Sequence, residues 1–415
     1  MHKNILANNT RYKDDGSHSQ KIVFVQPRWI QAWGAIGVGY IISYLRRYGY
    51  NNIMFYSGFF DSDSEIIRGC EDADIIGFSC TSGQIKSGLE LAKKVKKPSN
   101  CIVMGGVHPS ALPYDVLMNS CVDIVVIGEG ERAFLDIVRG NRNSIVQRPY
   151  IKDIDSIPFP DRKTVREERY INLESKHHGM RAATIISGRG CPFRCVFCAS
   201  HVVWSRKCRL RSPKNILDEF EQVINNWKVD FIKFSDDTFT INKRRVLKFC
   251  KEKIKCGINT KWGCNMRVDT IDEDMLSVMH KAGCTDVWLG VESGSPKILK
   301  DMKKGINIEQ IKWAFKKTAE LGFRRRAYFL LGMPEETIDD IKMTEQLADE
   351  IDADENIFTI LTPYPGSELY DNNKHVNIDW SLIDSYENYV MHTNFLDNKT
   401  LHLEQIRLVE KYNSR

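Results

Sequence analysis

One short stretch decides the fold of this chain: Gly188-Arg189-Gly190-Cys191-Pro192-Phe193-Arg194-Cys195-Val196-Phe197-Cys198. It places three cysteines within eight residues, with two glycines ahead of them and a proline among them. The apolar run Arg181–Ser187 comes directly before it and predicts a buried strand. A loop that follows a parallel strand lies at the edge of the sheet where ligands bind. The three cysteines are therefore predicted to lie at a functional site.

The alternation of apolar runs and helical stretches continues after this loop. Ser212-Pro213, and Thr270 with Glu273, have the spacing of helix starts. Six strand–helix repeats are too few for a complete eight-stranded barrel, and they predict a partial (β/α)6 barrel over residues 181–370 with its site at the carboxyl ends of the strands. The further predicted strands are Val229–Asp237, Lys261–Val268, Asp286–Gly294, Arg324–Met333 and Asn356–Pro363.

The residues before the loop show the same rhythm. They predict a doubly wound, Rossmann-like α/β domain over residues 21–140, whose ligand lies beyond the carboxyl ends of its strands. An amphipathic helix is expected at Gly37–Tyr48. The predicted strands are Lys21–Pro27, Ile53–Ser57, Asp74–Cys80, Cys101–Gly106 and Asp123–Gly130.

Three segments fall outside this rhythm. Residues 1–20 are polar and predict a disordered tail without a signal peptide. Residues 141–180 are charged and contain Ile157-Pro158-Phe159-Pro160, which predicts a linker lying across both domains. Residues 371–415 predict a polar carboxyl-terminal extension, helical or irregular, to which no function is assigned.

The composition is that of an ordinary folded protein, with 42% hydrophobic and 27% charged residues. A net charge of +5 over 415 residues is small, so no nucleic-acid partner is expected. No apolar stretch approaches the roughly 20 residues of a membrane span. Nine of the twelve cysteines are scattered singly, which is unlike a disulfide framework. These features predict a cytoplasmic protein that acts away from membranes.

Metal chemistry is the first interpretation of the three clustered thiols. Thiolates are the usual ligands of iron–sulfur clusters, whereas structural zinc takes four ligands. Cys191, Cys195 and Cys198 have no second cysteine pair nearby, although His201 offers a fourth zinc ligand. The spacing favours an iron–sulfur cluster and leaves zinc, or a chance grouping, as the alternatives.

The motif Cys191-x-x-x-Cys195-x-x-Cys198, with Phe197 before the last cysteine, resembles the signature of the radical SAM superfamily. The resemblance implies a [4Fe–4S] cluster whose fourth iron is left open for S-adenosylmethionine. Reductive cleavage of S-adenosylmethionine would then produce a 5′-deoxyadenosyl radical that abstracts hydrogen from the substrate. The three cysteines would be the metal ligands and the catalytic residues, and Phe197 would contact the cofactor.

Segments at later strand ends resemble the same superfamily and imply contacts with S-adenosylmethionine. Asp236 and Asp237 stand where the amino group of the methionine moiety would bind, although many members carry Gly-Gly-Glu there. Arg267 would pair with the methionine carboxylate. Glu292 and Ser293 would face the ribose, and Gly332 the adenine.

The amino-terminal segments resemble the cobalamin-binding domain fused to one radical SAM branch. The cofactor-binding residues that this resemblance implies are Ser79, Thr81, Gly105, Gly106, His108, Gly128 and Glu129. The Asp-x-His-x-x-Gly segment that ligates cobalt in other cobalamin proteins is missing, so the lower axial position is expected to lack histidine. His108 is otherwise interpreted as a turn histidine bonded to backbone, and loss of the cofactor from the domain is the alternative to cobalamin binding.

The resemblance implies a cobalamin-dependent C-methyltransferase that acts on an unactivated carbon of a small molecule. An external one-electron reductant of the flavodoxin or ferredoxin type is the implied partner. Three alternatives stay open: a radical cyclase or rearrangement enzyme, a methylthiotransferase-like enzyme with a second cluster, and a non-catalytic sensor. A substrate pocket between the domains would draw on Trp29, Trp33, Trp204, His201 and Tyr364.

Overall fold

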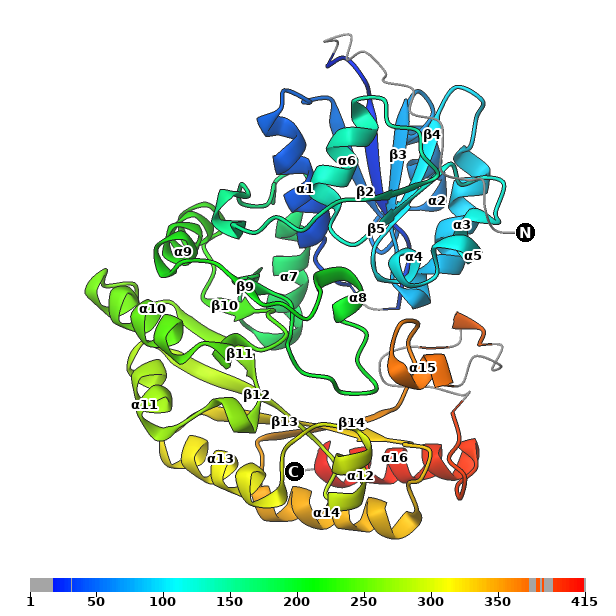
Figure 1. Cartoon of the computed structure of the whole chain (residues 1–415). Coiled ribbons are helices and arrows are strands. Elements are labelled where there is room, and N and C mark those ends of the chain that lie inside the picture. Colours follow the sequence, from blue (N-terminus) through cyan, green and yellow to red (C-terminus); the bar gives the residue numbers. More distant parts are fainter. Residues whose placement is uncertain (1–17, 31, 373–377, 381–382, 384–390, 414–415) are drawn as a thin grey trace.

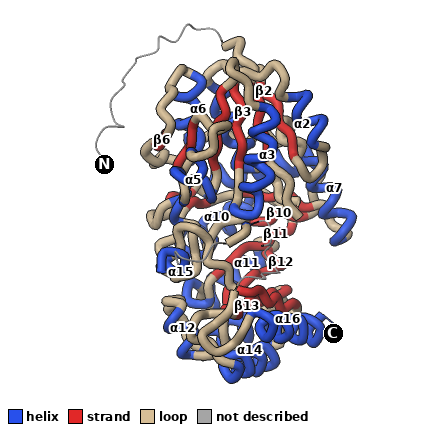
Figure 2. Tube along the Cα trace, turned by 90° about the vertical axis from the view of Figure 1, so that its right-hand side faces the viewer, coloured by secondary structure: helices blue, strands red, loops and turns tan. Residues whose placement is uncertain are grey.

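The chain forms two α/β parts, each built on a six-stranded parallel sheet (Figure 1). The computed structural model describes residues 18–30, 32–372, 378–380, 383 and 391–413. Residues 1–17, most of the predicted disordered tail, lie outside the described residues. Figure 2 shows the two sheets one above the other along the length of the molecule.

The amino-terminal sheet has the strand order β2-β1-β3-β4-β5-β6. The chain passes from β1 to β2 on one side and then crosses to β3 on the other, so the strand order reverses between β1 and β3. Such a reversal opens a crevice at the carboxyl ends of the strands, where doubly wound sheets bind ligands. The strands are β1 (Ile22–Gln26), β2 (Ile53–Ser57), β3 (Ile75–Ser79), β4 (Cys101–Gly105), β5 (Ile124–Ile127) and β6 (Ile145–Gln147).

Helices cover both faces of this sheet, and each face has its own apolar core. The predicted doubly wound domain is thereby confirmed. The sheet reaches farther than predicted, because the short strand β6 comes after residue 140. The helices are α1 (Ile36–Arg47), α2 (Asp63–Gly69), α3 (Ile85–Val95), α4 (Val107–Ala111), α5 (Pro113–Leu117) and α6 (Gly130–Val138).

The second sheet keeps its strands in chain order, β7-β10-β11-β12-β13-β14, with every neighbouring pair parallel. Among the described residues β7 and β14 do not pair, so the barrel is open. The predicted partial (β/α)6 barrel is confirmed. Its strands are β7 (Ala182–Ile185), β10 (Phe231–Phe234), β11 (Lys261–Met266), β12 (Cys284–Glu292), β13 (Arg324–Leu331) and β14 (Glu355–Ile360).

The barrel helices pack on the convex face of this sheet around one large apolar core. Ser212 caps α9 as predicted, with its hydroxyl accepting from the Asn215 N–H. The predicted cap at Thr270 is wrong, because Asp272 accepts from the Met275 N–H and starts α11. The helices are α9 (Pro213–Trp227), α10 (Lys243–Lys255), α11 (Glu273–Lys281), α12 (Pro296–Asp301), α13 (Ile308–Glu320) and α14 (Ile338–Ile351).

The predicted linker contacts both parts and contains a helix that the sequence did not predict, α7 (Glu167–His178). The Ser43 hydroxyl of α1 donates to the Phe159 carbonyl (2.6 Å). The Arg162 guanidinium donates to the Glu219 carboxylate of α9 (2.6 Å). The linker therefore ties the first helix of the amino-terminal part to the first long helix of the barrel.

The carboxyl-terminal extension packs against the last strand of the barrel. The short helix α15 (Glu368–Asn372) follows β14, and α16 (Asn398–Asn413) packs on that strand. Leu401 and Leu408 of α16 are fully buried. Among the described residues, none of the helices combines the length and apolar character that crossing a bilayer requires.

Candidate functional site

The cysteine loop is pinched off at its base by two short antiparallel strands, β8 (Gly188–Arg189) and β9 (Arg209–Leu210). A short helix, α8 (His201–Trp204), lies on its return path and packs against α4 of the amino-terminal part (Figure 1). Gly190 has a φ of 93°, and a Cβ there would lie 2.6 Å from the Lys207 carbonyl oxygen. Only glycine satisfies both conditions, so Gly190 lets the loop turn directly before its first cysteine.

The three thiols of the loop share one half-buried environment. Burial raises the pKa of Cys191, and it raises the pKa of Cys198 to about 11 with help from the charge of Asp237. In the part of the chain that the structure describes, no three His, Cys, Asp or Glu side chains converge on a single-ion site. An inorganic cluster differs in that each thiolate binds a different iron atom, so its ligands surround a larger group.

Arg267, at the end of β11, contacts the cysteine loop. Its Nη1 lies 3.7 Å from the Cys195 Sγ, and its guanidinium lies 3.6 Å from the centre of the Phe193 ring. Two N–H groups bind the Asp269 carboxylate (2.8 and 2.9 Å), and another donates to the Lys304 carbonyl (2.6 Å). These contacts hold the side chain beside the cysteine loop, and its contact with a methionine carboxylate stays a prediction.

The two aspartates after β10 have different surroundings. Asp236 is buried and accepts from the Ser187 N–H (2.6 Å) and hydroxyl (2.5 Å), with Arg245 3.6 Å away. It therefore joins the end of β7 to the end of β10. Asp237 is exposed and accepts from the Ser200 hydroxyl of the cysteine loop (2.6 Å). Of the pair, Asp237 is the carboxylate that faces open space beside the thiols.

Glu292 ends β12 in the left-handed region of backbone space, with a φ of 68°. A non-glycine residue held there is strained, and such strain is typical of functional sites. The carboxylate is paired with the buried Lys304 ammonium. A Cβ on Gly290 would lie 2.7 Å from the Lys304 Nζ, so glycine leaves the space that this ion pair occupies.

The other two predicted residues at this face support the backbone. Ser293 is fully buried, with its Oγ 3.1 Å from the Thr344 Oγ1. Gly332 has a φ of 100° and donates its N–H to the buried Glu336 carboxylate. Burial raises the pKa of Glu336 to about 7. A carboxyl group therefore holds the turn after β13 in place.

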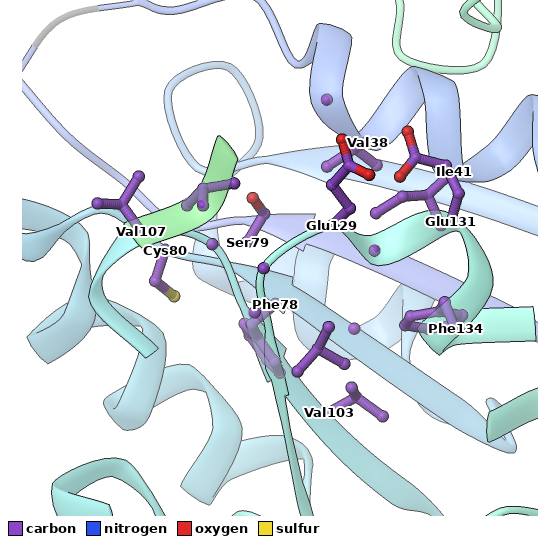
Figure 3. Close-up of a pocket in the computed structure, with 18 of the residues that line it drawn as sticks. Val38, Ile41, Phe78, Ser79, Cys80, Val103, Val107, Glu129, Glu131 and Phe134 are labelled. Atoms are coloured by element: carbon purple, nitrogen blue, oxygen red, sulfur yellow. The ribbon is translucent and has the colours of Figure 1, made fainter. Parts of the chain in front are cut away.

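The amino-terminal part contains a cavity of about 230 Å³ at the carboxyl ends of its strands. Its inner wall is apolar, and Figure 3 shows Phe78, Val103 and Phe134 gathered there. The carboxylates of Glu129 and Glu131 lie together elsewhere in the same view. Arg189, Val203 and Trp204 also line the cavity, so the cysteine loop supplies part of its wall.

Most of the predicted residues of the amino-terminal part line this cavity. Gly105 leaves room, because a Cβ there would meet nothing closer than 3.6 Å. Gly106 is constrained by its φ of 103° and by the Cys80 carbonyl, which a Cβ would approach to 2.6 Å. The predicted residues on the wall are Ser79, Thr81, Gly105, Gly106, Gly128 and Glu129.

His108 is absent from the cavity wall. It is buried, its Nδ1 lies 3.0 Å from the Ser82 Oγ, and its ring meets the Trp380 ring edge-on at 5.7 Å. Burial lowers the pKa of His108 to about 4. His108 therefore packs as a turn histidine, but its hydrogen-bond partner is the Ser82 hydroxyl and not the backbone group that was expected.

The five residues predicted to line a substrate pocket between the domains do not form one cluster. Trp204 lines the cavity, whereas Trp29 lines a separate hollow beside Phe59. The Tyr364 ring lies parallel to the Trp380 ring at 6.5 Å. Trp204 and His201 belong to α8, which packs against α4 at the boundary between the two parts.

Several charged residues at the site were missed by sequence reasoning. Lys304 pairs with Glu292, and Arg245 donates to the Ser187 carbonyl (2.9 Å). Sequence reasoning assigns no role to Arg189, although its place two residues before Cys191 is a usable signal.

Comparison with known proteins agrees with this geometry. Residues 185–348 match the radical SAM superfamily, and residues 31–138 match the B12 binding domain. An uncharacterized methyltransferase of Pyrococcus horikoshii is 31% identical over 336 residues, which cover 74% of this chain and 72% of that protein. The chain belongs to the radical SAM superfamily.

Two further comparisons connect this radical SAM chain to its branch. The anaerobic magnesium-protoporphyrin IX monomethyl ester cyclase of Rubrivivax gelatinosus is 29% identical over 390 residues, covering 84% of this chain and 69% of that protein. The radical S-adenosylmethionine methyltransferase TsrM of Kitasatospora setae, solved with cobalamin and a [4Fe–4S] cluster bound, superposes with a TM-score of 0.70 at 15% identity. That match covers 85% of this chain and 74% of TsrM, and it supports the same fold.

Membership in the radical SAM superfamily brings a [4Fe–4S] cluster and S-adenosylmethionine, and the B12 binding domain brings cobalamin. The residues present fit these groups. Three thiols of one loop would hold the cluster, and the cavity, with glycines on its wall, would admit part of a cobalamin molecule. When bound, the cluster supplies an electron to S-adenosylmethionine and cobalamin carries a one-carbon group. The chain contributes orientation, exclusion of water and the charges around the thiols.

Proposed function

We propose that this radical SAM enzyme is a cobalamin-dependent C-methyltransferase that places a methyl group on an unactivated carbon of a small molecule. One molecule of S-adenosylmethionine would be reduced by one electron and split into methionine and a 5′-deoxyadenosyl radical, which takes a hydrogen atom from the substrate carbon. A second molecule would give up its methyl group to the resulting carbon radical by way of cobalamin and become S-adenosylhomocysteine. One further electron from the external donor would balance this transfer.

One observation carries the proposal: the cysteine loop forms part of the wall of the cavity in the B12 binding domain. Arg189 lies two residues before Cys191, and Trp204 lies six residues after Cys198; both line that cavity. A cluster on the loop and a cofactor in the cavity would therefore be near neighbours, as methyl transfer to a radical carbon requires. The relative from Pyrococcus horikoshii, described as a methyltransferase, supports the same activity.

Within this proposal, residues at the carboxyl ends of the barrel strands would bind S-adenosylmethionine. Asp237 would meet the methionine amino group and Glu292 the ribose, while Gly332 would shape the turn near the adenine. Asp236 and Ser293 would act by holding these groups in position, because their polar atoms already have protein partners.

The substrate would lie over the concave face of the barrel. Side chains there alternate with the buried core and are half-buried, as a lining surface requires. Asn265, Trp288, Tyr328 and Thr359 come from four successive strands and offer two aromatic surfaces and two polar groups. This mixture suits a small organic molecule with a flat apolar portion.

We also propose a cytoplasmic setting and an external one-electron donor of the flavodoxin or ferredoxin type. All twelve cysteines lie in the described part of the chain and are free thiols, which supports a reducing compartment.

The test uses S-adenosylmethionine carrying a ¹³C-labelled methyl group, supplied with a reductant and candidate substrates to the anaerobically reconstituted enzyme. The proposal predicts labelled product together with S-adenosylhomocysteine and 5′-deoxyadenosine. Product that forms without the label, alongside 5′-deoxyadenosine, would exclude methyl transfer.

That outcome would favour the second candidate, a radical cyclase or rearrangement enzyme. It is supported by the similarity to the cyclase of Rubrivivax gelatinosus, which spans more of this chain than the match to the Pyrococcus protein. A methylthiotransferase-like enzyme would need a second cluster. Counting iron separates it, because one cluster contains four iron atoms and two contain eight.

A further inference from the structure

The base of the cysteine loop is joined to the B12 binding domain by two arginines and two glutamates. Arg189 donates to Glu129 (2.8 Å) and to Glu131 (2.6 Å). Arg209 donates through one nitrogen to both oxygens of Glu129 (2.8 and 2.9 Å). We call these four residues the arginine–glutamate clamp. Their side chains are at most 10% exposed, and their charges balance.

The clamp connects the two places where the cofactors are expected. Arg189 and Arg209 face each other across the β8–β9 ladder, which closes the base of the cysteine loop. Glu129 follows β5 and Glu131 lies in the first turn of α6, so both belong to the amino-terminal domain. Glu129, Glu131 and Arg189 line the cavity. One set of ion pairs therefore touches both the loop and the cavity wall.

Further contacts give the clamp a single geometry. Arg209 also donates to the Ile151 carbonyl (3.0 Å) and to the Trp204 carbonyl (3.2 Å). The Arg189 guanidinium lies 4.9 Å from the Trp204 ring and 5.1 Å from the Tyr40 ring. Planar guanidinium groups held by carboxylates and aromatic rings have little freedom to move. The return path of the loop, through Trp204, is thus fixed by the same arginines.

The hydrogen bonds of Glu129 indicate a structural contact and not a cofactor ligand. Its carboxylate already accepts from two arginines and from the Ile151 N–H (3.3 Å). A buried ion pair contributes little net stability compared with an apolar pair of the same shape, whereas its directional bonds can favour one geometry.

We infer that the arginine–glutamate clamp is a positioning device that fixes the separation between the cluster and cobalamin. The inference rests on the proposed function for its purpose, since the methyl group must reach a substrate carbon from which the radical has just removed a hydrogen atom. The distance between the two cofactors can be tested independently of that function, because it can be measured without substrate or turnover.

The experiment compares Glu129→Gln and Glu131→Gln with Glu345→Gln. Glu345 is the control: its carboxylate also binds two cations, Arg407 (2.7 Å) and Lys411 (2.9 Å), but it lies within the barrel part and does not line the cavity. Each protein is reconstituted with iron and sulfide and loaded with hydroxocobalamin. It is then reduced, so that both the cobalt, as cobalt(II), and the iron–sulfur cluster are paramagnetic. The magnetic coupling between the two centres then reports their separation.

We predict that both clamp variants retain iron and cobalamin while the coupling changes or broadens, and that Glu345→Gln leaves the coupling as in the parent. Unchanged coupling in a clamp variant that holds both cofactors would overturn the inference. Loss of cobalamin with the cluster intact would overturn it too, since Glu129 would then be a cofactor ligand. If Glu129→Gln does not fold, Arg209→Lys keeps the charge, removes the second nitrogen that donates to the Trp204 carbonyl and is judged by the same outcomes.

A second readout concerns turnover. We predict that the clamp variants form more 5′-deoxyadenosine per product molecule than the parent, because the radical would form while the methyl group is misplaced. Failure of the proposed function would remove product from the parent as well and leave the coupling measurement unaffected.

Discussion

The two cofactor regions are built in opposite ways, although both lie at the carboxyl ends of parallel strands. The cavity in the amino-terminal part has glycines and apolar side chains over most of its wall, and the charged residues on that wall belong to the clamp. The cysteine site is shaped by charged side chains that already have partners, such as Arg267 with Asp269 and Glu292 with Lys304. We therefore expect larger side chains to impair cofactor binding in the first region, and altered charges or ligands to impair it in the second.

The largest expected effect is that of Cys195→Ala, which removes a ligand from the cysteine site alone. We expect loss of the cluster absorbance and of iron, and 5′-deoxyadenosine below detection, while cobalamin still binds. Cys256→Ala is the control, because Cys256 is an exposed free thiol outside the site. Simultaneous loss of cobalamin would show that the two regions are not independent.

The next effect concerns bulk in the cavity. A Cβ at Gly105 is tolerated, since its nearest neighbour would be 3.6 Å away, but a longer side chain would enter the cavity. Overfilling a packed site costs about 1–3 kcal/mol. Gly105→Leu should therefore weaken cobalamin binding by roughly 10- to 100-fold, with Gly105→Ala close to the parent and the iron content unchanged. Equal binding by the leucine variant would place the cofactor elsewhere.

Local sequence patterns predicted the long buried strands and the cysteine loop, but not the shortest strand, one polar helix or the clamp. The strands were predictable because short, very apolar runs are typical of strands buried on both faces, and the three cysteines because they lie together. Strand β6 was missed because it has three residues, and α7 because its residues are mostly polar. The clamp was missed because its partners are separated by 58 to 80 residues along the chain, and no local pattern records such a pairing.

A smaller effect is expected from Arg267→Gln. Its N–H group faces the sulfur of Cys195, and hydrogen bonds to cluster sulfurs stabilise the reduced state. Losing a charged hydrogen bond should make the reduction potential of the cluster more negative, by about 50 mV. Arg206→Gln is the control, because Arg206 donates to the Phe193 carbonyl and not to sulfur. An unchanged potential in a redox titration would remove Arg267 from this role.

The smallest effect concerns pH. Burial raises the pKa of Glu336 to about 7 in the folded chain, from an ordinary value of 4.5. The folded chain then holds a proton that the unfolded chain has released, so the stability contributed by this group falls as the pH rises between these values. Glu336→Gln should gain about 2 kcal/mol over the parent between pH 5.5 and pH 8, read as a difference in thermal unfolding temperature. Glu335→Gln, at an exposed neighbour, should show no such trend.

The central claim is that three thiols of one loop hold a cluster that cleaves S-adenosylmethionine. Its most direct test is to reconstitute the anaerobic chain to about four iron atoms, add a strong reductant and S-adenosylmethionine, and measure 5′-deoxyadenosine by mass spectrometry. We predict 5′-deoxyadenosine and methionine in equal amounts. A chain that carries the full cluster, binds S-adenosylmethionine and forms neither product would contradict the claim.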